Sequence, residues 1–158
     1  MQIGPIVESD RAKLAALLGR IEQFAPDEVG VALELIDAAL REGDASGYGC
    51  LVARDEAGEP LGYTCVGPTP MTEATWDLYW IAVAPEQQGR GVGRALYGAL
   101  TAHLAARGGR QVRIETSSKE SYAATGGFYE RIGFEVCGRL RDFYAPGDDL
   151  LIFYRRLA

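Results

Sequence analysis

A short segment rich in glycine and arginine, QQGRGVGRAL at residues 87–96, stands directly before an apolar helical pattern. The first turn of a helix has backbone N–H groups without intrahelical partners and carries the positive end of the helix dipole. It can therefore bind an anion if the anion can approach the backbone closely. Gly89, Gly91 and Gly93 permit that approach because glycine has no side chain and tolerates positive φ, while Arg90 and Arg94 add positive charge. The segment therefore predicts a phosphate-binding turn. The alternative is that the glycines only shape a tight connection between a strand and a helix.

Two better-known phosphate motifs do not fit this segment. A P-loop would need a Gly-Lys-Ser/Thr sequence, which does not follow. The dinucleotide fingerprint needs a different glycine spacing and a different strand after the helix. The segment is therefore predicted to be neither a P-loop nor a dinucleotide-binding turn.

The charges of the chain are distributed unevenly. The net charge of -6 argues against nucleic acid as a partner. Residues 1–86 carry 15 acidic and 5 basic residues, whereas residues 87–158 carry 7 acidic and 11 basic residues. Five arginines and no acid lie between Gln87 and Ile114. The second half of the chain is therefore the half suited to an anion.

Length and composition predict one soluble globular domain over residues 1–158, because 47% of the residues are hydrophobic and 24% are charged. No apolar run approaches the roughly 20 residues of a membrane span. Glu8, Asp10 and Arg11 interrupt the N-terminal apolar residues, so no signal peptide is predicted and a cytoplasmic location is expected.

The cysteines and the one histidine predict no metal site and no disulfide framework. Cys50, Cys65 and Cys137 are far apart and odd in number, and we expect them to be small core residues on strands. His103 lies late in the helix that follows the glycine segment, where a solvent-facing position is expected. No second histidine is present to complete a metal site or a Ser-His pair.

Hydrophobic periodicity predicts four helices, over residues 10–20, 26–41, 91–107 and 120–132, with Asp10 as the N-cap of the first. Six strands are predicted, at YGCLVAR (48–54), LGYTCVG (61–67), WDLYWIAVA (76–84), QVRIET (111–116), FEVCGRL (134–140) and LLIFYRRL (150–157). RDFYAPGDD (141–149) is predicted to be the loop between the last two strands. This order of elements predicts a mixed sheet with helices on its faces.

Two motifs in this order resemble the GNAT superfamily of N-acyltransferases. LYWIAVAPEQQGRGVGRALYGAL (78–100) is similar to its acyl-CoA-binding motif, in which Gln or Arg is followed by x-x-Gly-x-Gly or Ala; Gln88, Gly91 and Gly93 take those positions. GFYERIGFEV (127–136) is similar to its second signature, Phe-Tyr-x-x-x-Gly-Phe, matched by Phe128, Tyr129, Gly133 and Phe134. The resemblance covers residues 48–157 well and the first two helices only by their placement.

The resemblance implies an α+β fold with a mixed, mostly antiparallel central sheet, helices on both faces and a splayed strand pair that forms an acyl-CoA cleft. It implies acetyl-CoA as co-substrate and no metal. The backbone of Ile81, Ala82 and Val83 would bind the pantetheine arm like an added strand, and the N–H of Ala82 or Ile81 would polarise the thioester carbonyl. The diphosphate would lie on the N–H groups of Gly89, Arg90, Gly91, Val92, Gly93 and Arg94.

The resemblance also implies acyl transfer to an amine, which must lose a proton before it attacks because an alkylamine has a pKa of about 10. Asp77 is at a position where several relatives place a glutamate base, and Glu115, Glu73 and a water chain are alternatives. Tyr129, beside Phe128, resembles the tyrosine that faces the CoA sulfur and donates to the departing thiolate.

One position departs from the family pattern. Many relatives have an asparagine seven residues before the tyrosine, where it contacts the pantetheine, and this chain has Tyr122 there. Ser117 or Ser118 is the candidate for that polar contact, and Tyr122 is expected beside the cofactor.

In this fold the acceptor is usually enclosed by the first two helices and the loop between the last two strands. Here these are the acidic half of the chain and the 141–149 segment, with Asp142, Asp148, Asp149, Phe143 and Tyr144. An acidic, partly aromatic mouth favours a small cationic or amino-acid-like amine, unless the acids are only surface charge. A non-catalytic acyl-CoA sensor and a protein N-terminal or lysine acetyltransferase are the alternative functions, and a homodimer is left open.

Overall fold

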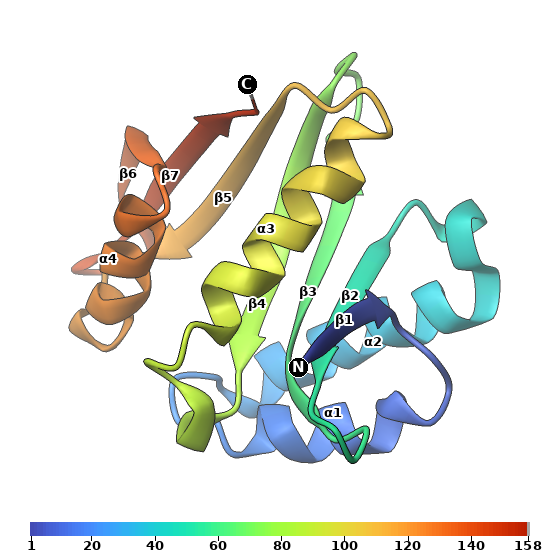
Figure 1. Ribbon diagram of the computed structural model, residues 1–158. Helices are drawn as coiled ribbons and strands as arrows, with labels where there is room; N and C mark the ends of the chain where they lie inside the picture. The colour runs from blue at the N-terminus through green and yellow to red at the C-terminus, as the bar shows by residue number, and fades with distance from the viewer. Residues whose placement is uncertain (158) are drawn as a thin grey trace.

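The computed structural model describes residues 1–157 and contains one seven-stranded sheet with the strand order β1-β2-β3-β4-β5-β7-β6 (Figure 1). The strands are β1 (Gln2–Pro5), β2 (Gly49–Arg54), β3 (Pro60–Pro68), β4 (Thr75–Val83), β5 (Gln111–Ser117), β6 (Glu135–Ala145) and β7 (Asp148–Arg156). Neighbouring strands are antiparallel except β4 and β5, which are parallel. The predicted α+β fold with a mixed, mostly antiparallel sheet is confirmed.

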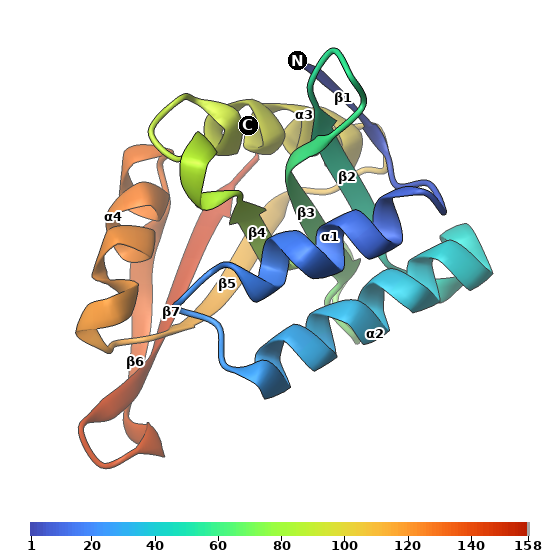
Figure 2. The same cartoon turned by 90° about the horizontal axis from the view of Figure 1, so that it is seen from below.

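Helices cover both faces of the sheet (Figures 1 and 2). The α-helices are α1 (Asp10–Gly19), α2 (Pro26–Glu42), α3 (Val92–Ala105) and α4 (Ala123–Arg131), with short 3-10 turns η1 (Gly43–Ser46), η2 (Pro85–Gln87) and η3 (Glu120–Tyr122). Leu14, Leu18 and Ile36 of α1 and α2 are fully buried in one apolar cluster with β2 and β3, and Leu100 and Leu104 of α3 are buried in another with β5 and β7. Among the described residues, no helix is long and apolar enough to cross a bilayer.

The two parallel strands separate soon after they meet. Register pairs join residues 75–77 of β4 only to residues 111–113 of β5, although β4 continues to Val83 and β5 to Ser117. Figure 1 shows the two strands diverging toward their C-terminal ends, with the start of α3 near the end of β4 and α4 next to β6 and β7. The splayed strand pair implied by the two motifs is therefore present in the fold.

A bulge in β4 changes the direction of its side chains within this region. Cys65 of β3 pairs with Trp80 and the next residue, Val66, pairs with Leu78, so Tyr79 is the extra residue of the bulge. An extra residue bends a strand and increases its twist. The bulge therefore lies just beyond the last pair that β4 makes with β5, where the strands begin to diverge.

Several sequence predictions need correction. The first strand, Gln2–Pro5, was not predicted, because four residues show too little alternation to be recognised. The 141–149 segment is not a loop: β6 runs to Ala145, and Gly147, with φ 80°, makes a tight turn into β7. The register of β6 slips at residues 141–144, so a bulge, which no alternation pattern predicts, takes the place of the loop.

Cys137, His103 and Asp10 also differ from expectation. Cys137 is exposed at a bulge of edge strand β6, whereas Cys50 and Cys65 are buried as predicted. His103 is half-buried against the backbone of Gly49, because α3 packs there on β2, and does not simply face solvent.

Asp10 does not act as a side-chain N-cap but lies within α1, where Ser9 is the capping position. Its carboxylate accepts hydrogen bonds from the Val7 amide at 2.8 Å and from the guanidinium of Arg54 in β2. Burial alone would raise the pKa of Asp10, but the bonds from Arg54 and Val7 outweigh it and hold the pKa below its ordinary value. The ion pair therefore joins the start of α1 to the sheet.

Candidate active site

A cleft of about 1290 Å³ opens where β4 and β5 diverge. Its walls come from residues 77–83 of β4, 113–117 of β5, the 87–94 segment, the 119–132 segment that contains α4, and the 21–28 segment, which ends in the first turn of α2. We call this space the cleft. It brings together segments from Ile21 to Asp148, including both motifs that carry the family resemblance.

The glycine-rich turn forms one end of the cleft. Gly89 and Gly91 have φ values of 75° and 84°, so both need the left-handed conformation that glycine adopts without strain. Within the described residues, no backbone carbonyl accepts a hydrogen bond from the amides of residues 89–94. Six consecutive N–H groups are thus available at the start of α3, which is the arrangement that binds phosphate.

The third glycine has another role. A Cβ on Gly93 would lie 3.1 Å from Cζ of Phe128, closer than van der Waals contact allows. Gly93 therefore lets Phe128 of α4 pack against the first turn of α3. Arg94 lines the cleft, whereas Arg90 does not.

The backbone of β4 offers alternate residues to the cleft. Ala84 donates its amide to Leu61 on the β3 side at 2.9 Å, and successive amides of a strand point to opposite sides. The amides of Ile81 and Val83 therefore point toward the cleft, while that of Ala82 points toward β3. Of the two candidate donors to a thioester carbonyl, this geometry favours Ile81.

Tyr129 projects from α4 into the cleft wall and is 6% exposed. Its ring packs between those of Phe128, Phe134 and Phe153, with centroids 5.5–5.9 Å apart. Burial raises the pKa of Tyr129, and no hydrogen bond from the described chain opposes that effect. The hydroxyl therefore keeps its proton and can donate it in a hydrogen bond.

The three candidate bases are placed differently. Asp77 and Glu115 both line the cleft, and Arg113 contacts both, with Nε 2.7 Å from Asp77 and Nη1 3.4 Å from Glu115. The Asp77 side chain is 11% exposed and that of Glu115 is 44% exposed. Glu73 pairs with Arg110 outside the cleft, so the structure does not bring it to the other candidates.

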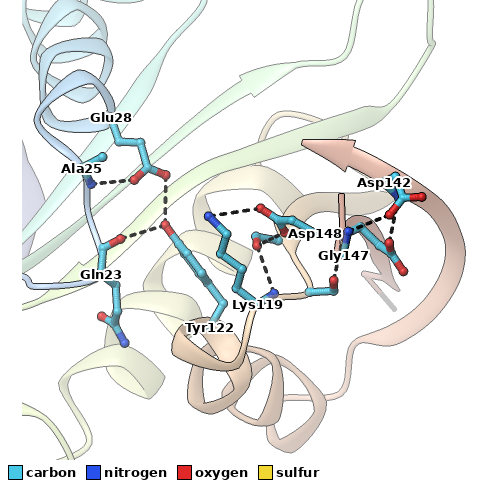
Figure 3. A network of polar contacts seen from close by, with 11 residues as sticks. Gln23, Ala25, Glu28, Lys119, Tyr122, Asp142, Gly147 and Asp148 are labelled. Atoms are coloured by element: carbon cyan, nitrogen blue, oxygen red, sulfur yellow. Dashed lines mark hydrogen bonds and ion pairs between the residues drawn. The ribbon is translucent and has the colours of Figure 1, made fainter. Parts of the chain in front are cut away.

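The predicted acidic mouth is smaller than expected, because the hairpin uses most of its own acids (Figure 3). Asp142 accepts from the Gly147 amide at 2.7 Å, and Asp149 accepts from the Asp142 amide at 2.8 Å and from Arg139. Neither lines the cleft. Asp148 does, together with Tyr144, but it is paired with Lys119 at 3.4 Å. Phe143 is an exposed neighbour of Tyr144.

The serine hydroxyls near this end are also engaged. Ser117 donates to Asp148, and Ser118, which does not line the cleft, accepts from the Asp149 amide at 2.8 Å. Tyr122 lines the cleft, but its hydroxyl contacts the 21–28 segment.

Sequence reasoning missed Phe24, Glu28 and Trp80 in the cleft wall. Phe24 and Trp80 form an edge-to-face pair with centroids 5.2 Å apart. Only Glu28 had a recognisable signal: it is the third residue after Ala25 at the start of a helix, and it accepts from the Ala25 amide at 2.7 Å, as in half of a capping box.

A divergent strand pair, a glycine turn with free amides and a buried tyrosine facing the gap define the GNAT class of acyltransferase domain. The chain belongs to this family: residues 46–136 match the family model described as an acetyltransferase (GNAT) domain. A crystal structure of a GNAT-family protein from Desulfovibrio desulfuricans is 40% identical, covers 99% of both chains and superposes with a TM-score of 0.93.

Curated relatives include an L-methionine sulfoximine/L-methionine sulfone acetyltransferase of Pseudomonas paraeruginosa, 35% identical over 66% of this chain and 58% of the relative. A mycothiol acetyltransferase of Kocuria rhizophila is 36% identical over 65% of this chain and 36% of the relative. The chain spans between 30% and 58% of the length of the curated relatives it matches. An aminoglycoside 6'-N-acetyltransferase complexed with coenzyme A, 17% identical with a TM-score of 0.78 over 100% of this chain and 98% of its own, shares the fold.

Proposed function

We propose that this protein is an acetyl-CoA-dependent N-acetyltransferase that acetylates a primary amine by direct attack in a ternary complex, with residues 1–158 as one catalytic domain. The observation that carries the proposal is the continuous cleft, which is lined both by the glycine turn with its free amides and by Tyr129 of α4. A diphosphate at one end and a thioester at the other would match this chemistry.

The residues present fit the co-substrate. The amides of residues 89–94 and the side chain of Arg94 would hold the diphosphate. Ile81 and Val83, whose amides point into the gap between β4 and β5, would hydrogen-bond the pantetheine as a strand would. Phe128 and Tyr129 would close the wall near the sulfur.

Each reacting group would then meet one residue of the chain. The Ile81 amide would donate to the thioester carbonyl as negative charge develops on its oxygen. Glu115 would take the proton of the amine, directly or through water, because Arg113 already occupies an oxygen of Asp77 at 2.7 Å and Glu115 is more exposed. Tyr129 would donate a hydrogen bond to the departing thiolate.

The acceptor would enter on the side of α1 and α2. Phe24, Trp80, Tyr144 and Glu28 line that end, so an amine with a small apolar or cationic group matches it by contact and charge. Two relatives are named as an L-methionine sulfoximine/L-methionine sulfone acetyltransferase and a mycothiol acetyltransferase, and these names support a small acceptor over a folded protein.

The proposal is tested by thiol release from acetyl-CoA, measured with a thiol reagent against a panel of amines. The panel contains L-methionine sulfone, L-methionine sulfoximine, an alkyl diamine, an aminoglycoside and a peptide with a free N-terminus. Amine-dependent release is expected, above the rate without amine. If none of the amines gives thiol release, although CoA raises the melting temperature, the protein is a non-catalytic acyl-CoA sensor. If only the peptide gives thiol release, the protein is a protein acetyltransferase.

A further inference from the structure

Two segments meet across the acceptor end of the cleft. One is the 21–28 segment, which joins α1 to the first turn of α2, and the other is the 117–122 segment, which joins β5 to α4. They are nearly a hundred residues apart in sequence, and both line the cleft. We call them the two lips.

Polar contacts connect the lips directly (Figure 3). The Tyr122 hydroxyl lies 2.9 Å from Oε1 of Glu28 and 3.1 Å from the carbonyl oxygen of Gln23. Gln23 in turn donates its Nε2 to the carbonyl of Ser121 at 3.3 Å. A hydroxyl has one proton, so Tyr122 donates to one acceptor at a time, and the charged carboxylate of Glu28 is the stronger acceptor.

Each side of this contact is held by its own segment. The other oxygen of Glu28, Oε2, accepts from the Ala25 amide at 2.7 Å, which fixes the carboxylate over the first turn of α2. On the opposite lip, Lys119 pairs with Asp148 at 3.4 Å, which attaches that lip to β7. Burial and the bond to Glu28 raise the pKa of Tyr122, so its hydroxyl stays protonated and remains a donor.

The position of the Tyr122 hydroxyl differs from the cofactor contact that the family pattern implies for this position. The Tyr122 hydroxyl instead hydrogen-bonds Glu28 in the 21–28 segment. The same segment carries Phe24, which packs edge-to-face on Trp80. If the contact between Tyr122 and Glu28 is lost, the 21–28 segment loses its main polar attachment to the β5–α4 side of the cleft.

We propose that Tyr122 is a positioning residue that clasps the 21–28 lip through Glu28 and so sets the affinity for the acceptor, while leaving coenzyme binding unaffected. The catalytic half of this inference rests on the proposed acetyltransferase function. The structural half, that one hydroxyl ties two distant segments, stands independently of the reaction.

The test uses the intact protein carrying Tyr122→Phe, with Tyr48→Phe as the matched control, because Tyr48 lies outside the cleft lining. Amide hydrogen exchange is followed by mass spectrometry in peptides that cover residues 21–28 and 117–122. In Tyr122→Phe, exchange should accelerate about tenfold in both segments, since a bond to a charged group is lost, and Tyr48→Phe should leave both unchanged. Unchanged exchange, or acceleration in one segment only, would overturn the clasp.

Two further measurements separate the clasp from a cofactor contact. Calorimetric titration with CoA should give Tyr122→Phe the wild-type Kd within about twofold, whereas a Kd weakened by about tenfold would make Tyr122 a cofactor residue and overturn the proposal. With the best amine of the panel above, KM should rise about tenfold at nearly constant kcat, and a lower kcat at constant KM would contradict it.

A second variant guards against misfolding. Glu28→Gln keeps one oxygen, which can accept from the Ala25 amide, and places an uncharged NH2 against the Tyr122 hydroxyl, which can accept from it. The contact is weakened but not removed, so exchange and KM should change in the same direction and less than in Tyr122→Phe. A larger effect than that of Tyr122→Phe would contradict the assigned contact. If wild-type protein binds no CoA, the acetyltransferase proposal fails, and hydrogen exchange still decides whether the clasp exists.

Discussion

Replacing Tyr129 by phenylalanine removes one oxygen from the wall of the cleft and leaves the ring. The ring makes the packing contacts with Phe128, Phe134 and Phe153, and the hydroxyl hydrogen-bonds no residue of the described chain. No buried partner is therefore left unsatisfied by the substitution. We expect the melting temperature to stay within about 2 °C of wild type, since the change in stability should be below about 0.5 kcal/mol.

The effect on catalysis follows from what the hydroxyl can do. With reference pKa values of about 10 for tyrosine and about 8.5 for a thiol, full proton transfer to the thiolate is uphill by roughly 2 kcal/mol. Burial raises the pKa of Tyr129 further, so the hydroxyl acts as a hydrogen-bond donor. A hydrogen bond to a charged group contributes about 1.5–3 kcal/mol, which corresponds to a loss of roughly ten- to a hundredfold in kcat.

The assay compares steady-state thiol release and CoA affinity for wild type and Tyr129→Phe. The loss should appear in kcat, because the bond forms as the thiolate develops, and the Kd for CoA should change by less than about twofold. An unchanged kcat, with chemistry shown to be rate-limiting by single-turnover measurement, would remove the tyrosine from the mechanism. A Kd weakened as much as kcat would assign it to coenzyme binding.

The other predictions concern the glycine turn, the base and one buried carboxylate. Gly91→Ala places a Cβ on a backbone with φ 84°, with open space around it. The backbone strain of about 1–3 kcal/mol should disfavour the turn conformation that binds the diphosphate and so weaken CoA binding about tenfold in calorimetry. Gly98→Ala, in the exposed interior of the same helix, should leave the Kd unchanged and raise the melting temperature by about 2 °C. Glu115→Gln should lower kcat by at least about a hundredfold and Asp77→Asn by less; the reverse order would make Asp77 the base. Asp10 has a lowered pKa, so its ion pair stabilises the fold above the unfolded-state pKa of about 3.9 and is lost as pH falls through the still lower folded-state pKa. Urea denaturation should therefore show Asp10→Asn destabilised strongly at pH 7 and much less near pH 2, whereas an equal loss at both values would mean that ionisation is irrelevant.

Local patterns predicted the elements that have strong periodicity. The helix over 26–41 and the strands around Val52, Tyr63 and Ile114 were recognisable because apolar residues recur at helical or alternating spacing. The parallel meeting of β4 and β5 and their divergence were implied only by the family resemblance, since no local pattern encodes which strands pair.

In the candidate site, too, some residues could be predicted from the sequence and others could not. Gly89, Gly91 and Tyr129 stood out because a motif carries them, and the structure places all three on one cleft. The contact between Tyr122 and Glu28 could not be foreseen, because it joins residues nearly a hundred positions apart through side chains.

The acids of the 141–149 segment show the opposite error. From the sequence alone, these acids suggested an open acidic loop. In the structure they lie in a bulged hairpin whose amides need acceptors, and Asp142 and Asp149 supply them. Charge in a sequence therefore indicates an electrostatic surface only after the internal hydrogen bonds of the segment are known.

A crystal structure of the protein with coenzyme A bound will decide whether the cleft between β4 and β5 is the acyl-CoA site. We expect the diphosphate within hydrogen-bond distance of the amides of residues 89–94, the pantetheine alongside Ile81 and Val83 in the gap between β4 and β5, and the sulfur facing Tyr129. A coenzyme bound elsewhere, or a gap that stays closed or filled by side chains at saturating coenzyme, would contradict it.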